Sequence, residues 1–321
     1  MSGVRAIETI EALRYFNPVS ETSTLEPARD LAAHGLEAAV AVARAYGVRS
    51  RDPEILAARS NLILHLRPAP VVARVAGATA ILRPDVREWL GREVAVAGFL
   101  AGRGVAGVVP PSQEIPPGPH EHGGLILSFW RFVQPDPGRQ PSVAGAAAAL
   151  QDLHGALRDF PGELPLLAPP LVEVPRLLDR IERLGDLGAS DLARLREAWE
   201  RLAPVLRSPA RPVQALHGDA HLRNLIATAD GLLWNDFEDT CSGPVEWDLA
   251  CFCRQVSEGR EAALAAYGAG APALEELAPW LEARDLQGTV WLLAMSRPFP
   301  DRRARAGEML ARWRRGGGHL G

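Results

Sequence analysis

The sequence contains no lysine, so all 35 of its basic side chains are arginines. With 39 acidic side chains the formal net charge is -4, which argues against a nucleic-acid-binding protein, because such proteins usually present a basic stripe. A site that elsewhere depends on lysine must here use arginine. The exchange is not conservative, since the planar guanidinium fork meets phosphate oxygens differently from a point charge.

Cysteine is also scarce: Cys241, Cys251 and Cys253 lie close together and have no distant partners. This pattern predicts reduced thiols rather than a disulfide framework. No apolar run approaches the roughly 20 residues of a membrane helix, and the chain does not open with a charged-then-apolar signal pattern. We therefore expect a cytoplasmic monomer or homodimer with no membrane partner and no nucleic-acid partner.

The most informative stretch reads HGDAHLRN at 217–224 and continues with DFED at 236–239. Within it, Asp219, Asn224 and Asp236 supply two carboxylates and a carboxamide, the oxygen ligands that hard cations such as Mg2+ prefer. Phosphoryl transfer needs such a set. One carboxylate orients a hydroxyl and accepts its proton, while an Asn and a second Asp hold the metal that bridges the phosphates.

Apolar runs flank these polar groups. The run at 213–216 enters the stretch, and the run at 232–234 follows the hairpin turn Asp230-Gly231. We predict that these two runs pair as short strands. This pairing would put the first carboxylate and the carboxamide on a loop and Asp236 at the exit of a strand.

The spacing H-x-D-x-x-x-x-N at 217–224, followed by D-F-E in place of D-F-G, resembles the catalytic segment of protein kinases. With its glycine at 218, the loop is more similar to the H-G-D-x-x-x-x-N of the aminoglycoside phosphotransferase and choline-kinase-like family. An activation segment ending in A-P-E is absent, which disfavours a protein kinase. The resemblance implies an α+β, bilobal, protein-kinase-like fold with a small β-rich N-lobe, one key helix in it, and a larger, mainly helical C-lobe.

We place the lobe boundary in the proline-containing connection that begins at residue 134. Residues 1–133 would then form the nucleotide-binding N-lobe, with a helix at 24–46 and a hairpin of β-rich runs at 62–66 and 71–75. Residues 134–321 would form the C-lobe, with the catalytic loop, the metal site and the acceptor-binding helices.

Two further helices have recognisable starts. We expect Asp85 to begin one, in a capping pair with Glu88, and Ser142 to cap the next.

Two charged residues fall at positions that should be buried. Arg74 lies in the middle of an apolar strand, and Glu93 lies within the apolar stripe of the helix that follows. A buried charge is costly unless it is paired, and kinase-like proteins pair a strand lysine that holds the phosphates with a helix glutamate. We predict that Arg74 and Glu93 form this pair. The alternative is a surface arginine and a glutamate at the wet end of the stripe.

The remaining nucleotide contacts follow from position. No Gly-rich phosphate loop is present, which leaves the backbone amides around Ser60 and Asn61 as groups that could meet phosphate. The resemblance implies that backbone groups of Phe129, Trp130 and Arg131, at the hinge between the lobes, hold adenine. The two aromatic side chains are equally consistent with core packing.

The resemblance also implies a role for each polar residue of the central stretch. Asp219 would be the catalytic base, and Asn224 and Asp236 would bind Mg2+. His217 would hold the shape of the loop, and Asp248 would brace it.

Three more carboxylates, Glu238, Asp239 and Glu246, follow in the chain. They could attract a cationic acceptor such as an aminoglycoside or choline, or they could be supporting or surface charges. We therefore predict ATP- or GTP-dependent transfer of a γ-phosphoryl group to a hydroxyl of a small molecule, with an antibiotic such as an aminoglycoside as one candidate. The alternative is a catalytically silent kinase-like nucleotide-binding module, suggested by Arg74 and the missing Gly-rich loop.

Overall fold

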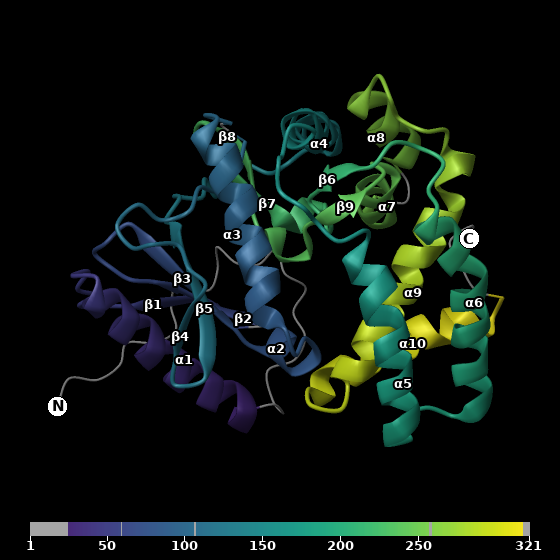
Figure 1. The fold of residues 1–321 in the computed structure, drawn as a ribbon, viewed down its shortest axis with the longest axis horizontal. Helices are drawn as coiled ribbons and strands as arrows, with labels where there is room; N and C mark the ends of the chain where they lie inside the picture. The colour runs from purple at the N-terminus through teal and green to yellow at the C-terminus, as the bar shows by residue number, and fades with distance from the viewer. Residues whose placement is uncertain (1–24, 59, 106, 257–258, 317–321) are drawn as a thin grey trace.

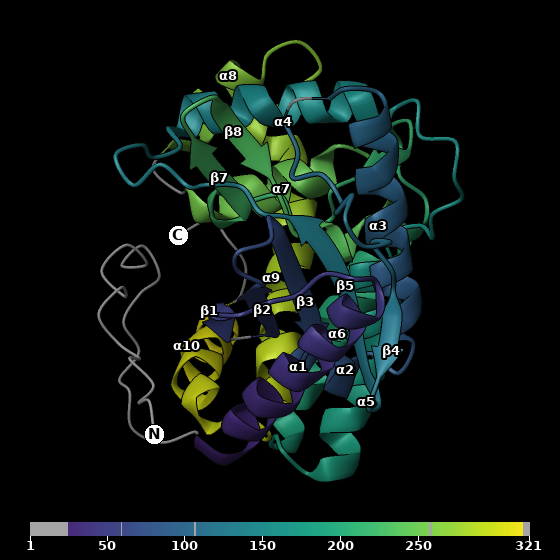
Figure 2. The same cartoon turned by 90° about the vertical axis from the view of Figure 1, so that its left-hand side faces the viewer.

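The computed structural model describes residues 25–316 except 59, 106 and 257–258. A five-stranded antiparallel sheet with the order β1-β2-β3-β5-β4 organises its first part. The strands are β1 Glu54–Ala58, β2 Asn61–His65, β3 Val71–Ala76, β4 His120–His122 and β5 Leu125–Arg131. Helix α1 (Leu25–Ala45) lies across one face of the sheet, and Figure 2 shows it in front of the strands.

The two faces of the sheet differ because successive side chains of a strand point to opposite sides. On the face toward α1, Leu64, Ala73 and Phe129 join α1 residues in a fully buried apolar core. Arg74, one residue on from Ala73, belongs to the opposite face and pairs in register with Ser128 of β5. The sheet therefore directs Arg74 away from α1.

The local predictions for this part hold with one exception. The helix expected at 24–46 is α1, and the expected hairpin is β2–β3. Ser142 caps α4 (Val143–Leu157), since its hydroxyl accepts the Gly145 N–H at 3.0 Å. The capping role predicted for Asp85 at the start of α3 (Val86–Gly102) is wrong, because its side chain makes no cap hydrogen bond.

The rest of the chain is mainly helical, and Figure 1 shows α5 to α10 gathered on the side away from the sheet. After α2 (Ala78–Leu82), α3 and α4, the helices are α5 Val174–Leu184, α6 Ala189–Arg207, α7 Glu246–Gln255, α8 Arg260–Tyr267, α9 Ala278–Met295 and α10 Arg303–Arg314. The predicted boundary between residues 133 and 134 falls in the connection between β5 and α4. Helix α3 lies in the middle of the molecule and packs against both β5 and the short turn Phe237–Asp239.

Two small antiparallel ribbons carry the central polar stretch. β6 (Gln214–Leu216) pairs with β9 (Cys241–Gly243), and β7 (Leu225–Thr228) pairs with β8 (Gly231–Trp234). The predicted pairing of 213–216 with 232–234 is therefore wrong. A two-residue turn joins only the strands that flank it directly, so β8 pairs with β7. The β6 strand lies directly before the HGD segment and β9 shortly after the DFED turn, so the β6–β9 ribbon brings the two ends of the polar stretch together.

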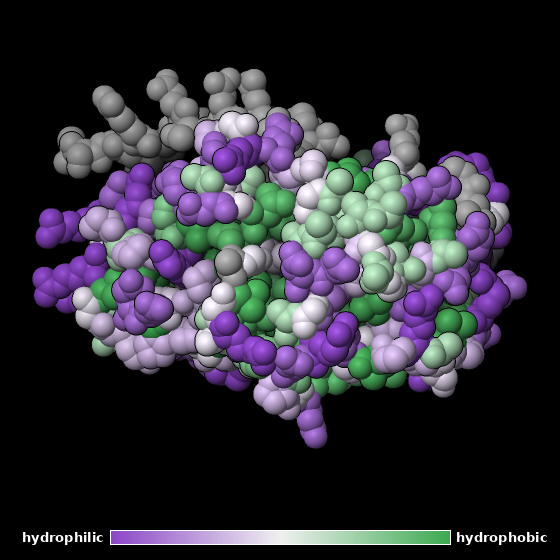
Figure 3. Space-filling view, turned by 90° about the horizontal axis from the view of Figure 1, so that it is seen from above, coloured by the Kyte–Doolittle hydropathy of each residue, from purple (hydrophilic) through white to green (hydrophobic). Residues whose placement is uncertain are grey.

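The surface is mixed in character. Figure 3, a view from above, shows green apolar areas interleaved with purple polar ones. Within the described part of the chain, no helix has both the length and the apolar composition that crossing a membrane requires.

Candidate active site

The loop between β6 and β7 is fixed by a carboxylate from α7. Asp248 is fully buried, and its two oxygens accept the backbone N–H groups of His217 and Gly218, each at 2.8 Å. One of these oxygens also lies 3.0 Å from Nε2 of His154. These contacts match the bracing role predicted for Asp248, since they hold the start of the HGD segment in one conformation.

Gly218 is required by the close approach of two chain segments. Its φ is +88°, and a Cβ at this position would lie 1.9 Å from the carbonyl oxygen of Asp239. Its own carbonyl accepts the indole N–H of Trp247 at 2.9 Å. The glycine therefore brings the HGD loop against the DFED turn.

His217 occupies a buried position in the same loop. Its Nε2 lies 3.0 Å from the carbonyl oxygen of Asn235, and its ring packs on Phe237 with centroids 4.5 Å apart. Burial lowers the pKa of His217, which keeps the ring neutral near pH 7. The geometry supports a role in loop shape rather than in proton transfer.

Asp219 and Asn224 are joined within the loop, because the Asn224 side-chain amide donates to the Asp219 backbone carbonyl at 2.9 Å. The Asp219 carboxylate accepts a hydrogen bond from Nη2 of Arg284 and lies 3.4 Å from Nε2 of His221. Burial alone would raise the pKa of Asp219, but Arg284 and His221 outweigh it and hold this pKa well below its usual range. Asp219 is therefore ionised.

The predicted ion pair between Arg74 and Glu93 is confirmed. Arg74 Nη1 lies 2.5 Å from Glu93 Oε1, and both side chains are buried. Arg74 Nη2 donates to Asp236 at 2.7 Å, and it donates to Glu238 as well. Asp236 follows β8 in the left-handed region with a φ of 65°, a conformation that non-glycine residues rarely adopt. One guanidinium therefore ties the sheet to helix α3 and to the DFED turn.

Sequence reasoning missed a second buried arginine, Arg83, which follows α2. Its Nε donates to Glu173 at 2.6 Å, and its Nη1 and Nη2 donate to Glu238 and Asp239 at 2.8 and 2.6 Å. The guanidinium also lies 3.8 Å from the ring centroid of Trp89. Nothing local marks it in the sequence, because its partners are 90 to 156 residues away.

The three carboxylates for which the sequence left two alternatives open, a cationic acceptor or supporting charges, are engaged by arginines. Glu238 and Asp239 bind Arg83, and Glu238 also binds Arg74. Glu246 pairs at 2.6 Å with Arg211, which precedes β6. These contacts favour the alternative of supporting charges, because the three groups neutralise arginines of the fold.

The side chain of Asn61 is engaged within the fold. The Asn61 side chain donates to Glu238 at 2.9 Å, and its oxygen accepts from Gly77 N–H and Thr79 Oγ1. Asn61 therefore braces the junction between β3 and α2. The phosphate contact of the backbone amides around Ser60 and Asn61 stays a prediction.

Part of the backbone predicted to hold adenine is engaged within the fold. The N–H groups of Phe129 and Arg131 donate to the carbonyls of Pro117 and Pro110 at 2.9 and 3.0 Å. These two N–H groups are not available to a nucleobase, and the adenine contact of the other backbone groups at 129–131 stays a prediction. The side chains of Phe129 and Trp130 are buried in apolar clusters, which fits the core-packing alternative.

An apolar surface that the sequence did not reveal lies next to this connection. Both parts of the chain contribute partly buried side chains that pack against the cluster of Ala97, Val109 and Trp130. They are Val72, Val94, Val133, Ile226 and Leu233. Such a contact between the sheet and the β7–β8 hairpin offers flat apolar contacts of the kind that a nucleobase ring needs.

The metal-binding expectation rests on Asn224 and Asp236. The Asn224 amide nitrogen is tied to a backbone carbonyl, which leaves the side-chain oxygen as its coordinating atom, and the Asp236 side chain is 43% exposed. Two oxygen donors fit Mg2+, which commonly takes one or two protein oxygens, phosphate oxygens and water. Within the described ranges, no group of three or more His, Cys, Asp or Glu side chains is arranged to hold a metal ion.

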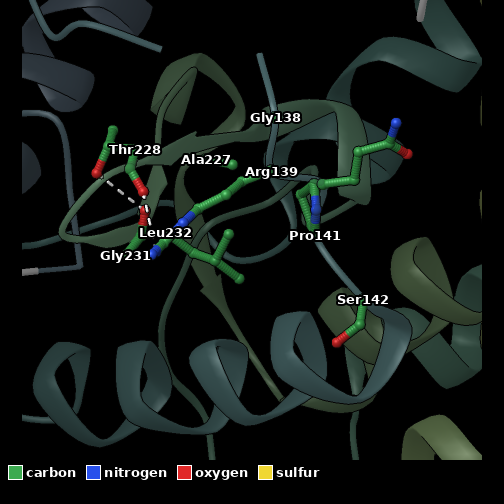
Figure 4. A pocket seen from close by; sticks show the side chains of 9 residues that line it. Gly138, Arg139, Pro141, Ser142, Ala227, Thr228, Gly231 and Leu232 are labelled. Carbon is green, nitrogen blue, oxygen red and sulfur yellow. Dashed lines mark hydrogen bonds between the residues drawn. The ribbon is translucent and has the colours of Figure 1, made fainter. Parts of the chain in front are cut away.

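A pocket of about 410 Å³ lies beside the β7–β8 hairpin but contains none of the predicted site residues (Figure 4). Residues 138–142 form one wall, and β7 and β8 form the other. Arg139 reaches across it to the carbonyl of Thr228 at 3.4 Å. No carboxylate lines this pocket, so the pocket is not a candidate for a phosphoryl-transfer site.

Solved structures of other proteins share this fold. A choline/ethanolamine kinase family protein from Mesorhizobium loti has a TM-score of 0.60 at 21% identity, over 88% of this chain and 94% of its own. An amicoumacin kinase in complex with AMP-PNP and Ca2+ has a TM-score of 0.62 at 11% identity, over 83% and 89%. APH(2")-IIIa, in complex with GDP and kanamycin, has a TM-score of 0.58 at 15% identity, over 88% and 99%. No curated protein sequence matches the chain.

The kinase-like α+β fold predicted from the sequence is confirmed. The fold is of the kinase-like type, and the family model that matches the chain is one of phosphotransferase enzymes. Residues 25–280 match the phosphotransferase enzyme family, and the chain belongs to that family.

We predict that Gly218→Ala lowers the free energy of unfolding by about 3 kcal/mol or more, because the added Cβ overlaps the Asp239 carbonyl and the φ is strained. Gly98→Ala, at an exposed position inside α3 with no atom within 4 Å of the added Cβ, should stabilise by up to about 1 kcal/mol. Urea unfolding of both variants measures the contrast. Equal effects would contradict the close approach.

The carboxylates around Arg74 predict a pH dependence. Burial raises the pKa of Glu93 to about 8, and Arg74 opposes this only in part. The resulting stability is present below the usual value of 4.5 and is lost as the pH rises through about 8. We expect the free energy of unfolding of the nucleotide-free protein to fall between about pH 5 and pH 8, and Glu93→Gln to flatten the fall. Identical slopes in denaturant titrations would contradict this.

Proposed function

We propose that the protein transfers the γ-phosphoryl group of ATP or GTP to a hydroxyl of a small molecule. The observation that carries the proposal is the guanidinium of Arg74, which bonds Glu93 and Asp236 at once. This contact supports the proposal, because a cation able to bind phosphate lies beside a carboxylate suited to Mg2+, and the DFED turn approaches the loop that carries Asp219 at Gly218.

Each residue has a defined part. Asp219, ionised in the free protein, accepts a hydrogen bond from the acceptor hydroxyl and then its proton. The hydroxyl oxygen bonds to the γ-phosphorus, the bond from this phosphorus to the β-phosphate oxygen breaks, and the nucleoside diphosphate leaves with the electron pair. Because the transition state is loose, orienting the hydroxyl is a large part of what Asp219 does.

The nucleotide is held from both parts of the chain. Arg74 donates to phosphate oxygens, and Val72, Ile226 and Leu233 pack against the base. The N–H of Phe132 donates to the Pro70 carbonyl at 2.8 Å, so the backbone beyond Phe132 is the segment that would offer polar groups to the edge of the nucleobase. Asn224 and Asp236 would hold Mg2+, which neutralises charge on the phosphates when bound.

The similar structures do not indicate which acceptor this chain uses. The structure with kanamycin is 15% identical to this chain, and a likeness at that level supports the shared fold but not a shared substrate. An aminoglycoside antibiotic is thus one candidate among small-molecule alcohols, and ATP and GTP are equal candidates as donors.

We predict that Asp219→Asn lowers Mg2+-dependent turnover of ATP or GTP by about 10²- to 10⁴-fold and leaves nucleotide affinity within a fewfold, because only the base is lost. Release of phosphate to water and transfer to a panel of alcohols are both measured. The control is Asp230→Asn, an exposed aspartate at the β7–β8 turn. Equal turnover of wild type and Asp219→Asn would leave the silent nucleotide-binding module as the better description.

A further inference from the structure

The catalytic base, Asp219, is in contact with an arginine that the proposed phosphoryl transfer does not require. Arg284 of α9 donates from Nη2 to the Asp219 carboxylate and from Nη1 to the side-chain oxygen of Gln287. Its guanidinium lies 5.7 Å from the ring centroid of Trp247, and the side chain is 13% exposed. Contacts within the protein therefore hold both terminal nitrogens of the Arg284 guanidinium in place.

The position of α9 puts this arginine on the acceptor side of Asp219. Helix α9 packs against α2, α5 and α7, while the nucleotide contacts proposed above come from the sheet and the β7–β8 hairpin. An acceptor hydroxyl that reaches Asp219 must approach next to Arg284, because the two side chains are in contact.

The charges nearby do not favour a cationic acceptor. Glu238 and Asp239 bind Arg83, and Asp219 binds Arg284. An ammonium group would have to displace an arginine from its carboxylate and would then lie beside a second cation. An anion meets the opposite situation, because it can replace Asp219 as the partner of Arg284.

We infer that Arg284 is the specificity-determining residue of the acceptor site and that the acceptor is an anionic alcohol, with a carboxylate or phosphate near the reacting hydroxyl. The inference rests on the proposed function. When the acceptor binds, its anion takes the guanidinium, which suits the planar geometry of a carboxylate or phosphate. Asp219 is released to accept the hydroxyl proton. Arg284 thus couples recognition of the anion to exposure of the base.

The test uses two matched sets of acceptors that differ mainly in charge. One set is 3-hydroxypropionate, propane-1,3-diol and 3-aminopropan-1-ol, and the other is glucuronate, glucose and glucosamine. Binding to the protein with Mg2+ and a non-hydrolysable nucleotide is measured by calorimetry, and transfer is measured from labelled ATP or GTP. We expect the carboxylate member to give the highest kcat/KM in at least one set, and to bind more tightly than the amine by about tenfold or more.

Variants at Arg284 test whether the preference for the carboxylate member depends on this residue. Arg284→Gln should lower kcat/KM for the carboxylate member by about a hundredfold, mainly through KM, and should remove the preference over the amine. Arg284→Lys should restore part of it, because it keeps the charge without the fork. The control is Arg305→Gln, an exposed arginine of α10 that should change neither value.

Two results would overturn the inference. One is an equal response to the carboxylate and amine members, including no response to either, and the other is an unchanged preference in Arg284→Gln. Asp219-dependent release of phosphate to water is recorded in parallel. If that activity persists while the preference is absent, the acceptor class is wrong and the phosphotransferase assignment stands. If it is absent too, the proposed function fails.

Discussion

Two buried arginines hold the sheet and the helical part of this protein against each other. Arg74, from β3, and Arg83, after α2, both reach the DFED turn that follows β8. Their carboxylate partners are Glu93, Glu173, Asp236, Glu238 and Asp239. Removing one member of such a buried network leaves an uncompensated charge, which typically costs about 3–5 kcal/mol. In the function that we propose, the placement of the nucleotide relative to the catalytic base would depend on these contacts.

The same network contains more carboxylates than guanidinium groups. Two guanidinium groups face five carboxylates, and burial raises the pKa of Glu93 to about 8 and that of Asp239 to about 7, so part of this excess is held as protons near neutral pH. Asp236, whose side chain is 43% exposed, is the member of the set that solvent reaches most easily. The absence of lysine is accommodated here, since the arginine fork bonds a helix and a loop at the same time.

Sequence reasoning succeeded where the signal was local. The HGD and DFED segments and the buried positions of Arg74 and Glu93 follow from spacing and periodicity, and the structure confirms their ion pair. It failed where partners are distant. Arg83 and Arg284 are two of 35 arginines, and no local pattern shows that they meet Asp239 and Asp219. The same limit applies to β5, because only the folded chain shows that the carbonyls of Pro110 and Pro117 occupy the N–H groups of Arg131 and Phe129.

The central claim is that Glu93 acts on the nucleotide through Arg74, which a double-mutant cycle on Mg2+-nucleotide affinity tests directly. Calorimetry would compare wild type, Arg74→Met, Glu93→Gln and the double variant. We predict that Arg74→Met weakens binding by about tenfold or more, that Glu93→Gln weakens it less, and that the double variant is no weaker than Arg74→Met alone. Losses that simply add would contradict the account.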